Sequence, residues 1–293
     1  TMPVATRPSF TLRLPGGRML SLGGRTLVMG ILNLTPDSFA GSVGSADVGS
    51  AVDAALRLEG AGADLIDIGG ESTRPGAAPV SGDEECRRVV PVIEALAGRV
   101  RVPVSVDTTK ARVAAEAISA GASIVNDISG LQYDPELGDV VAGRGVPLVL
   151  MHTRGTPATM AGLARYRDPV AAVVEELNEA IARARAAGVP DAQMIVDPGI
   201  GFAKAPAHSY ALLARLPDLA VLGRPLLVGP SRKSFMREAL GAVPPAERDW
   251  GTAAAVTTAI LGGAHIVRVH AVAELVQVAR VADAVRAQVE STE

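Results

Sequence analysis

The residues best suited to chemistry in this sequence stand directly after short runs of apolar residues. Eight such runs are each followed by groups that can bind a ligand or ionise. These groups are Asn33, Asp67, Asp107, Asn126, His152, Asp197, Ser231 to Lys233, and Arg268 with His270. Polar loops after strands are common in themselves. Carboxylates and amides at the final strand position, however, are costly to bury together unless a ligand or cation satisfies them. We therefore expect a binding site where these strand ends meet.

Two kinds of chemistry are mixed among these groups. Asp107, Asn126 and Asp197 offer acceptors and an amide, which suit a flat heterocycle with an amino-pyrimidinone edge, since one carboxylate can accept two parallel N–H bonds. A second set suits an anion, most simply a phosphate: Thr73, Lys233, Arg268 and His270. Asn33 supplies a hard oxygen of the kind that magnesium accepts beside a pyrophosphate. The combination predicts a heterocycle that carries an anionic leaving group.

The elements that must position these groups read as alternating strands and helices. The eight apolar runs are rich in Val, Ile and Leu with little alternation, which is typical of parallel strands buried on both faces. They span residues 27–32, 63–68, 102–106, 123–125, 147–151, 193–196, 225–228 and 265–269. Segments of helical period lie between them, and they predict a (β/α)₈ TIM barrel, whose sites lie at the C-terminal ends of the strands. A doubly wound open sheet is the alternative, although it typically uses fewer strands in one domain of this size.

The N-terminal segment has a different pattern. Thr11, Arg13 and Leu20 to Leu22 lie on either side of Pro15-Gly16-Gly17, which reads as a hairpin with a glycine-bearing turn. We expect this short β-hairpin to cap the bottom of the barrel. The sequence shows no linker or internal repeat, so we predict a single domain over residues 1–293, with residues 1–26 as its hairpin extension.

Composition excludes several classes of protein. The chain has 293 residues, of which 48% are hydrophobic, enough for one large core. Its formal net charge of -3, with charges scattered, argues against nucleic-acid binding. The longest apolar run is shorter than the 18 residues expected of a membrane-spanning helix. Cys86 is the single cysteine, which rules out an intramolecular disulfide, fits a cytoplasmic location and reads as a packing residue.

Several motifs resemble, in the same order, those of the dihydropteroate synthases, a family of pterin-binding TIM barrels. The longest are Met29 to Phe39 (MGILNLTPDSF), Ile66 to Gly76 (IDIGGESTRPG) and Asp197 to Lys204 (DPGIGFAK). Shorter matches are Ser105 to Thr108, Val125 to Ile128, Met151-His152, Ser231 to Ser234 and Arg268 to His270. Each motif would be weak alone, but their length and order make chance a poor explanation.

The resemblance implies a role for each matching residue. The pterin clamp is formed by Asp107, Asn126 and Asp197, and Lys233 contacts the pterin and faces the second substrate. Asn33 is the magnesium ligand. Pyrophosphate is bound by Thr73, Arg268 and His270. The wall around p-aminobenzoate is formed by Pro75, Phe202 and Ser234. Asp37 and Arg74 lie on two loops that close over the site, and the catalytic residues are Asp37, Lys233 and Arg268.

The implied activity is a transferase reaction of folate biosynthesis. A pterin pyrophosphate is joined to p-aminobenzoate with magnesium present, in a cytoplasmic homodimer that is a target of sulfonamides. The chain departs from the family pattern where Gly41 and Ala271 replace the usual acidic residues, and where Ala203 replaces a common glycine. Two alternatives follow: a pterin-binding methyltransferase-type barrel, and a pterin-binding homologue without turnover.

Overall fold

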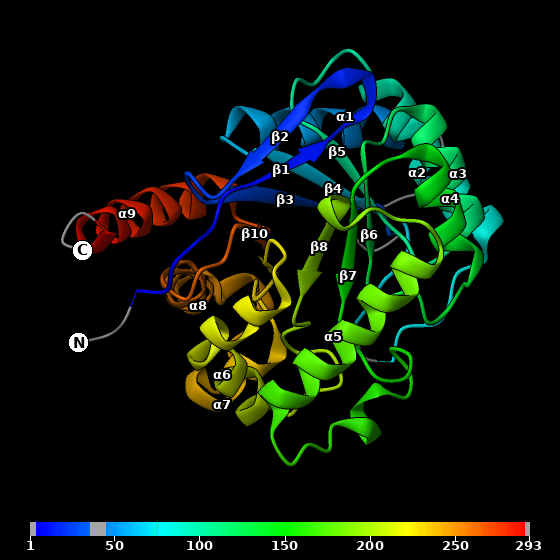
Figure 1. Cartoon of the computed structure of the whole chain (residues 1–293). Coiled ribbons are helices and arrows are strands. Elements are labelled where there is room, and N and C mark those ends of the chain that lie inside the picture. The colour runs from blue at the N-terminus through cyan, green and yellow to red at the C-terminus, as the bar shows by residue number, and fades with distance from the viewer. Residues whose placement is uncertain (1–3, 36–44, 75, 291–293) are drawn as a thin grey trace.

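Eight parallel strands form a closed ring at the centre of the molecule (Figure 1). The computed structural model describes residues 4–35, 45–74 and 76–290. The ring consists of β3 (Leu27–Asn33), β4 (Leu65–Gly69), β5 (Val104–Asp107), β6 (Ile124–Asp127), β7 (Leu148–Met151), β8 (Met194–Asp197), β9 (Leu227–Val228) and β10 (Ile266–Val269). The strands pair in the order β8-β7-β6-β5-β4-β3-β10-β9, and a parallel bridge from Val196 to Leu226 joins the two ends. The predicted barrel is confirmed, and the open sheet is excluded.

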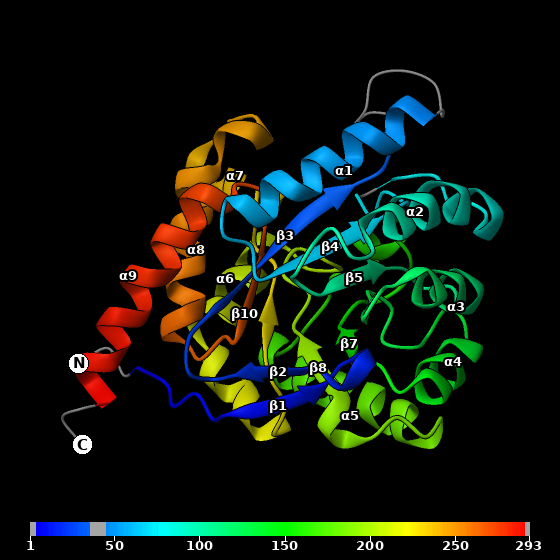
Figure 2. The same ribbon diagram turned by 90° about the horizontal axis from the view of Figure 1, so that it is seen from above.

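Helices surround the ring, as the view in Figure 2 shows. They are α1 (Ser45–Gly60), α2 (Gly82–Leu96), α3 (Ala111–Ala120), α4 (Glu136–Arg144), α5 (Pro169–Ala186), α6 (Pro206–Ala214), α7 (Arg237–Leu240), α8 (Asp249–Leu261) and α9 (Val272–Glu290). Short 3-10 turns occupy Pro15–Gly17, Met160–Leu163, Asp191–Gln193, Leu216–Leu222, Ser234–Met236 and Pro245–Glu247. Local sequence explains several helix starts: Ser81 caps α2 by accepting the Glu84 N–H at 3.3 Å, and Asp168 caps α5.

The N-terminal hairpin closes the bottom of the barrel, as predicted. Strands β1 (Phe10–Arg13) and β2 (Met19–Leu22) are antiparallel, and Gly16 in their turn has a φ of 72°, which favours glycine. Leu12, Leu14 and Leu22 of this segment are buried with the lower ends of the barrel strands. Gln193 fixes the hairpin, because its side-chain amide exchanges two 2.8 Å hydrogen bonds with the backbone of Arg13.

The inward-facing side chains change character along the strands. Alternate residues of a strand point into the barrel. Near the hairpin these residues are apolar and packed together: Leu27, Met29, Leu65, Ile124, Val149, Ile195, Leu227 and Ile266. Two positions further on, β4, β6, β8 and β10 carry Asp67, Asn126, Asp197 and Arg268 at the other end of the barrel. The strands therefore bring together the polar groups that the sequence places after apolar runs.

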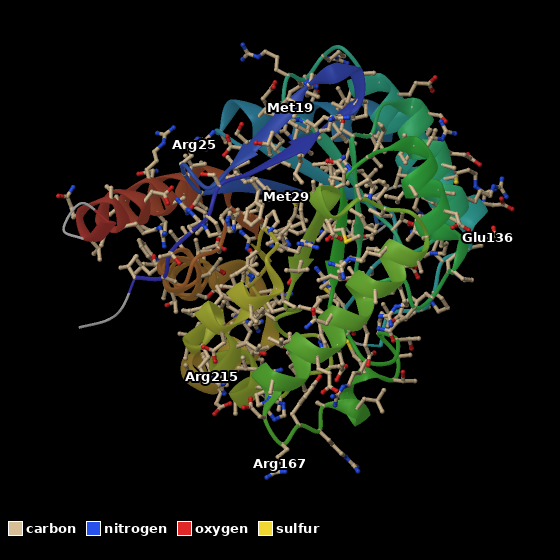
Figure 3. All side chains as sticks on the ribbon, viewed as in Figure 1. Met19, Arg25, Met29, Glu136, Arg167 and Arg215 are labelled. Atoms are coloured by element: carbon tan, nitrogen blue, oxygen red, sulfur yellow. The ribbon has the colours of Figure 1, made fainter. Side chains whose placement is uncertain are left out.

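Many charged side chains lie on the outer surface, alongside a smaller number of exposed apolar ones such as Val281 and Val285. In Figure 3 the side chains of Glu136, Arg167 and Arg215 extend from the periphery, whereas Met29 lies inside and is fully buried. Within the described part of the chain, no helix combines the length and the apolar character needed to cross a membrane.

Candidate active site

A cleft of about 510 Å³ opens at the C-terminal ends of the strands. Nine of the predicted site residues line it: Asn33, Thr73, Arg74, Asp107, Phe202, Lys233, Ser234, Arg268 and His270. Asn126 and Asp197 lie deeper, and their exposed fractions are 4% and 5%. Asp37 and Pro75 lie outside the described residues. Side chains from loops far apart in the sequence thus share one cavity with a polar floor.

The floor contains a buried ion-pair network around Arg268. Its Nε donates to Asp67 Oδ2 at 2.6 Å, and its Nη2 donates to Asp107 Oδ2 at 2.8 Å. The Asn126 amide also donates to Asp67 Oδ2, at 3.0 Å. Burial raises the pKa of Asp107 to about 7, although the charge of Arg268 opposes this shift. Arg268 therefore neutralises the carboxylates of the floor as well as lining the cleft where an anion was expected.

Asp67 is a site residue to which sequence reasoning gave no role. Its side chain is fully buried, and its Oδ1 has no hydrogen-bond partner among the described residues. An unpaired buried carboxylate oxygen beside Asn126 is an acceptor available to a ligand N–H or to water. Asp67 lies two residues after Leu65 on the same strand, and Leu65 points into the barrel. Because alternate residues of a strand share a face, this spacing was the sequence signal that could have identified Asp67.

The loop after β8 organises the side of the cleft that faces Lys233. Asp197 Oδ1 accepts the Gly199 N–H at 2.7 Å, and Lys233 Nζ donates to Ile200 O at 2.5 Å. The Lys233 ammonium also lies 4.5 Å from the centroid of the Phe202 ring, a cation–π distance. Burial lowers the pKa of Lys233 to about 8, with the Asp197 carboxylate opposing the shift, and burial also raises the pKa of Asp197.

The opposite rim carries groups suited to an anion. His270 Nδ1 lies 2.8 Å from Ser231 Oγ, which also accepts the His270 backbone N–H at 3.2 Å. Ser231 therefore orients His270 in this chain, in which the next residue is Ala271 and not an acidic residue. Burial, with the nearby charge of Arg268, lowers the pKa of His270 to about 4, so the ring is neutral at physiological pH. Neither Ser231 nor its contact with His270 could be assigned a role from the sequence.

The remaining predicted residues lie on the upper wall. Thr73 and Arg74 belong to the segment that follows β4 and line the cleft. A hydrogen bond of 3.0 Å from the Val80 N–H to Glu71 Oε1 links the two sides of this segment. Ser234 begins the 3-10 turn that follows Lys233 and lines the cleft. The structure thus brings every described residue of the predicted site to one end of the barrel.

Comparison with known proteins agrees with this site. A sequence model of the family described as pterin binding enzyme matches residues 29–270. The dihydropteroate synthase of Synechocystis is 48% identical over 276 residues, covering 94% of this chain and 96% of that protein. The chain therefore belongs to the pterin-binding enzymes and, within them, to the dihydropteroate synthases.

Solved structures give the same result. Dihydropteroate synthase from Xanthomonas albilineans, solved with 4-aminobenzoic acid, superposes with a TM-score of 0.88 at 45% identity, covering 96% of this chain and 99% of that one. The Yersinia pestis dihydropteroate synthase in a sulfonamide drug complex has a TM-score of 0.88 at 46% identity, covering 95% and 100% of the two chains. The likeness extends over the whole barrel.

Proposed function

We propose that this chain joins 6-hydroxymethyl-7,8-dihydropterin pyrophosphate to p-aminobenzoate, giving 7,8-dihydropteroate and pyrophosphate in folate biosynthesis. The observation that carries this proposal is the juxtaposition in one cleft of a buried acceptor floor and a rim suited to an anion. Asp107, Asn126 and Asp197 suit the N–H edge of the pterin, while Lys233 and His270 lie beside them at the mouth.

The reaction is a substitution at the exocyclic methylene of the pterin. Its carbon–oxygen bond breaks, and the electron pair leaves with pyrophosphate. The lone pair of the aniline nitrogen then forms the new carbon–nitrogen bond, and that nitrogen loses a proton. The protein contributes mainly by placing N–H groups and positive charge where negative charge develops on the leaving group. When the Ser231 hydroxyl donates to Nδ1 of the neutral His270 ring, the ring proton lies on Nε2, which is the tautomer that can donate to an anion.

A turnover assay with both substrates and magnesium tests the proposal. Formation of 7,8-dihydropteroate that depends on each substrate supports it. A pterin-binding methyltransferase would bind a pterin without needing the pyrophosphate, and a homologue without turnover would bind both ligands but form no product. Asp107→Asn serves as the negative control, because it removes an acceptor from the floor while keeping the shape of the side chain.

The residues at the end of β3 fit a magnesium ion. Asn33 is the last residue of β3 and lines the cleft, where its amide oxygen is a hard ligand. Among the described residues no three His, Cys, Asp or Glu side chains form a metal cluster. Magnesium commonly takes one or two protein ligands together with substrate phosphates and water. When bound, it supplies charge neutralisation of the pyrophosphate.

Calorimetry tests this role of Asn33 apart from turnover. We expect magnesium to bind weakly to the free protein and clearly once pyrophosphate is present. Asn33→Ala should reduce the gain, whereas Ser50→Ala on α1 serves as a control away from the cleft. Equal magnesium affinity with and without pyrophosphate would contradict the assignment.

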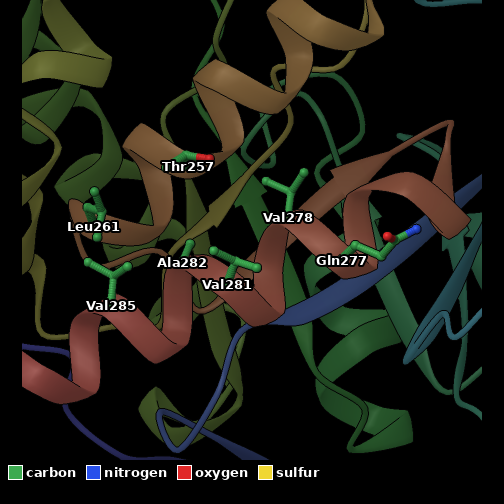
Figure 4. Close-up of a pocket in the computed structure, with 7 residues that line it drawn as sticks. All are labelled: Thr257, Leu261, Gln277, Val278, Val281, Ala282 and Val285. Atoms are coloured by element: carbon green, nitrogen blue, oxygen red, sulfur yellow. The ribbon is translucent and has the colours of Figure 1, made fainter.

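We also propose that the chain forms a homodimer through the outer face of α8 and α9. Figure 4 shows apolar side chains of the two helices around a shallow pocket, among them Leu261, Val278, Val281 and Val285. Val281 and Val285 are 66% and 50% exposed and lie one helical turn apart on the same apolar patch, which a second copy would bury. Sedimentation of the wild type and of Val281→Asp tests this. A dimer that the substitution leaves intact would contradict it.

A cytoplasmic location is the remaining proposal. Cys86 is the sequence's single cysteine; it is a buried free thiol, and burial raises its pKa to about 11, so little of it is thiolate at neutral pH and its state does not indicate a compartment. The support comes instead from the absence of any disulfide framework. Fractionation of cells that produce a tagged chain tests the location.

A further inference from the structure

A chain of polar side chains, centred on the buried His152, lies behind the loop after β8 and outside the residues that line the cleft. Lys204 Nζ lies 2.8 Å from His152 Nδ1 and donates to Phe202 O at 2.9 Å. His152 Nε2 lies 3.0 Å from Glu176 Oε2 on α5. The His152 side chain is 1% exposed. Three residues from separate segments of the chain thus connect α5 to the backbone of Phe202, which lines the cleft.

The protonation states of these side chains determine which of them donates and which accepts each hydrogen bond. Burial lowers the pKa of His152 to about 4, so its ring is neutral and has one N–H. Contacts with His152 and Arg154 lower the pKa of Glu176 to about 2 against the effect of burial, so it is an anion that can only accept. The histidine proton therefore lies on Nε2, and Nδ1 is left as the acceptor for Lys204. Lys204 thus has a defined acceptor on each side, the ring of His152 and the carbonyl of Phe202.

His152 also contacts the loop through its backbone. Its N–H donates to Asp197 O at 2.9 Å. A Cβ on Gly199 would lie 2.0 Å from His152 O, so only glycine fits where the loop passes this residue. The loop is consequently wrapped around His152, with Asp197 at its start and Lys204 at its end.

A second set of contacts holds the same loop from outside. Ala203 has a φ of 47°, the left-handed region that ordinary residues avoid. The Tyr166 hydroxyl donates to Ala203 O at 2.9 Å, and the Tyr166 ring lies 4.0 Å from the Arg154 guanidinium carbon. Arg154 in turn is paired with Glu176. An unfavourable backbone conformation persists only where surrounding contacts enforce it, and here they converge on Glu176.

We propose that Lys204 is a positioning residue for the second substrate: with His152 and Glu176 it fixes the backbone of Phe202, and so the ring that forms the p-aminobenzoate wall. This inference rests on the proposed function. Phe202 is the cleft residue whose carbonyl Lys204 contacts directly, whereas Asp197 is also held by strand β8. Loss of the contact should therefore affect p-aminobenzoate more than the pterin.

Two substitutions of His152 separate its contacts. Asn places a side-chain oxygen near the position of Nδ1 and keeps an acceptor for Lys204, whereas Gln reaches toward Glu176 and removes that acceptor. We expect His152→Gln and Lys204→Met to raise the KM for p-aminobenzoate about tenfold, the usual effect of leaving a buried polar group without its hydrogen-bond partner. The KM for the pterin substrate should change less than about twofold, which is the deviation expected between sites that are not coupled. His152→Asn should lie between these variants and the wild type, because it keeps the acceptor for Lys204 but loses the contact with Glu176.

The matched control is Glu179→Gln, on the same helix but 64% exposed. Glu176→Gln, which keeps the shape of the side chain, covers the case in which Lys204→Met fails to fold, and it should change p-aminobenzoate binding in the same direction. An unchanged KM for p-aminobenzoate in His152→Gln and Glu176→Gln, or an equal rise for both substrates, would overturn the proposal.

A readout independent of turnover separates this inference from the proposed function. If the wild type forms no product, the proposed function fails, and amide hydrogen exchange at Phe202 and Ala203 still tests the positioning role. Faster exchange there in His152→Gln than in His152→Asn supports it, and equal exchange in the two variants contradicts it.

Discussion

The two ends of the barrel interior are built from the same strands but differ in almost every physical respect. At the hairpin end, Leu65, Ile124 and Ile195 point inward and pack against Leu12 and its neighbours. Two residues along the same strands, Asp67, Asn126 and Asp197 point inward at the open end. The same strands contribute to both ends, so the contrast lies in which side chains the sequence places at alternate positions.

This contrast separates stability from binding. The apolar end excludes water and contributes hydrophobic free energy without any ligand. The polar end buries carboxylates, and desolvation raises the pKa values of Asp107 and Asp197. Their charged forms are therefore less stable in the folded protein than in water. Such groups are expected where a ligand supplies the missing partners.

The largest expected effect breaks binding at the polar end alone. In Asp197→Asn an amide N–H would face an N–H of the pterin, costing about 4 kcal/mol, or roughly a thousandfold in affinity. The free energy of unfolding should stay the same or rise, because burial disfavours the charge that is removed. Calorimetry with a pterin and thermal unfolding measure the two quantities. Unchanged affinity would remove Asp197 from the clamp.

The converse change weakens the apolar end alone. Leu12 is fully buried, so Leu12→Ala should lower the free energy of unfolding by about 3 kcal/mol through lost burial and the cavity that remains. Denaturant unfolding measures this, and kcat/KM measured well below the melting temperature should match the wild type. Val221→Ala, at a side chain that is 75% exposed, is the matched control. A large fall in kcat/KM would show that the two ends are coupled.

The third prediction uses pH, because the titrating groups with shifted pKa values of about 7 and 8 are both at the polar end. Asp107 loses its charge below a pKa of about 7, and Lys233 loses its charge above a pKa of about 8. If both charged forms are needed, kcat/KM should be highest between these values and fall about tenfold per pH unit on each side. The limbs belong to the interacting cluster as a whole. In Lys233→Arg the fall in kcat/KM at alkaline pH should shift to higher pH, because arginine keeps its charge there. If that fall does not shift, it is caused by the titration of another group.

The smallest expected effect divides the polar end itself. Ser231→Ala removes the hydroxyl that orients His270, and it should weaken pyrophosphate binding by about 1 kcal/mol, or roughly fivefold. Binding of a pterin without phosphate should not change, since Ser231 lies on the rim. Parallel titrations of the two ligands measure the difference. Equal losses would mean that Ser231 supports the floor as well.

Much of this arrangement could be predicted from the sequence because the determining signals are local. Continuous Val, Ile and Leu runs predict the strands to within about two residues at each end, since burial on both faces removes the polar alternation. Polar residues that follow those runs predict the mouth, because the carboxyl ends of parallel strands meet at one edge.

The parts that could not be predicted depend on contacts between distant residues. The Ser231–His270 contact joins residues 39 apart, and the His152–Lys204 contact joins residues 52 apart. Nothing near either residue indicates its partner, because the distance is set by the closure of the barrel. The pairing of Arg268 with Asp67 and Asp107 is of the same kind, so the sequence suggested only an anion-binding role for an arginine that also neutralises the floor.

The seam between β8 and β9 is the thinnest part of the ring. β9 has two residues, and the contact across the seam consists of the Val196–Leu226 bridge and a 3.0 Å hydrogen bond from the Val196 N–H to Pro225 O. Asp197 follows on one side of this seam, and the segment that carries Lys233 follows on the other. If a pterin is held by both side chains, as proposed, it would span the two margins. The bound substrate would then link the two sides of the seam and stabilise the closed barrel. In the protein without substrate, local opening should begin between β8 and β9.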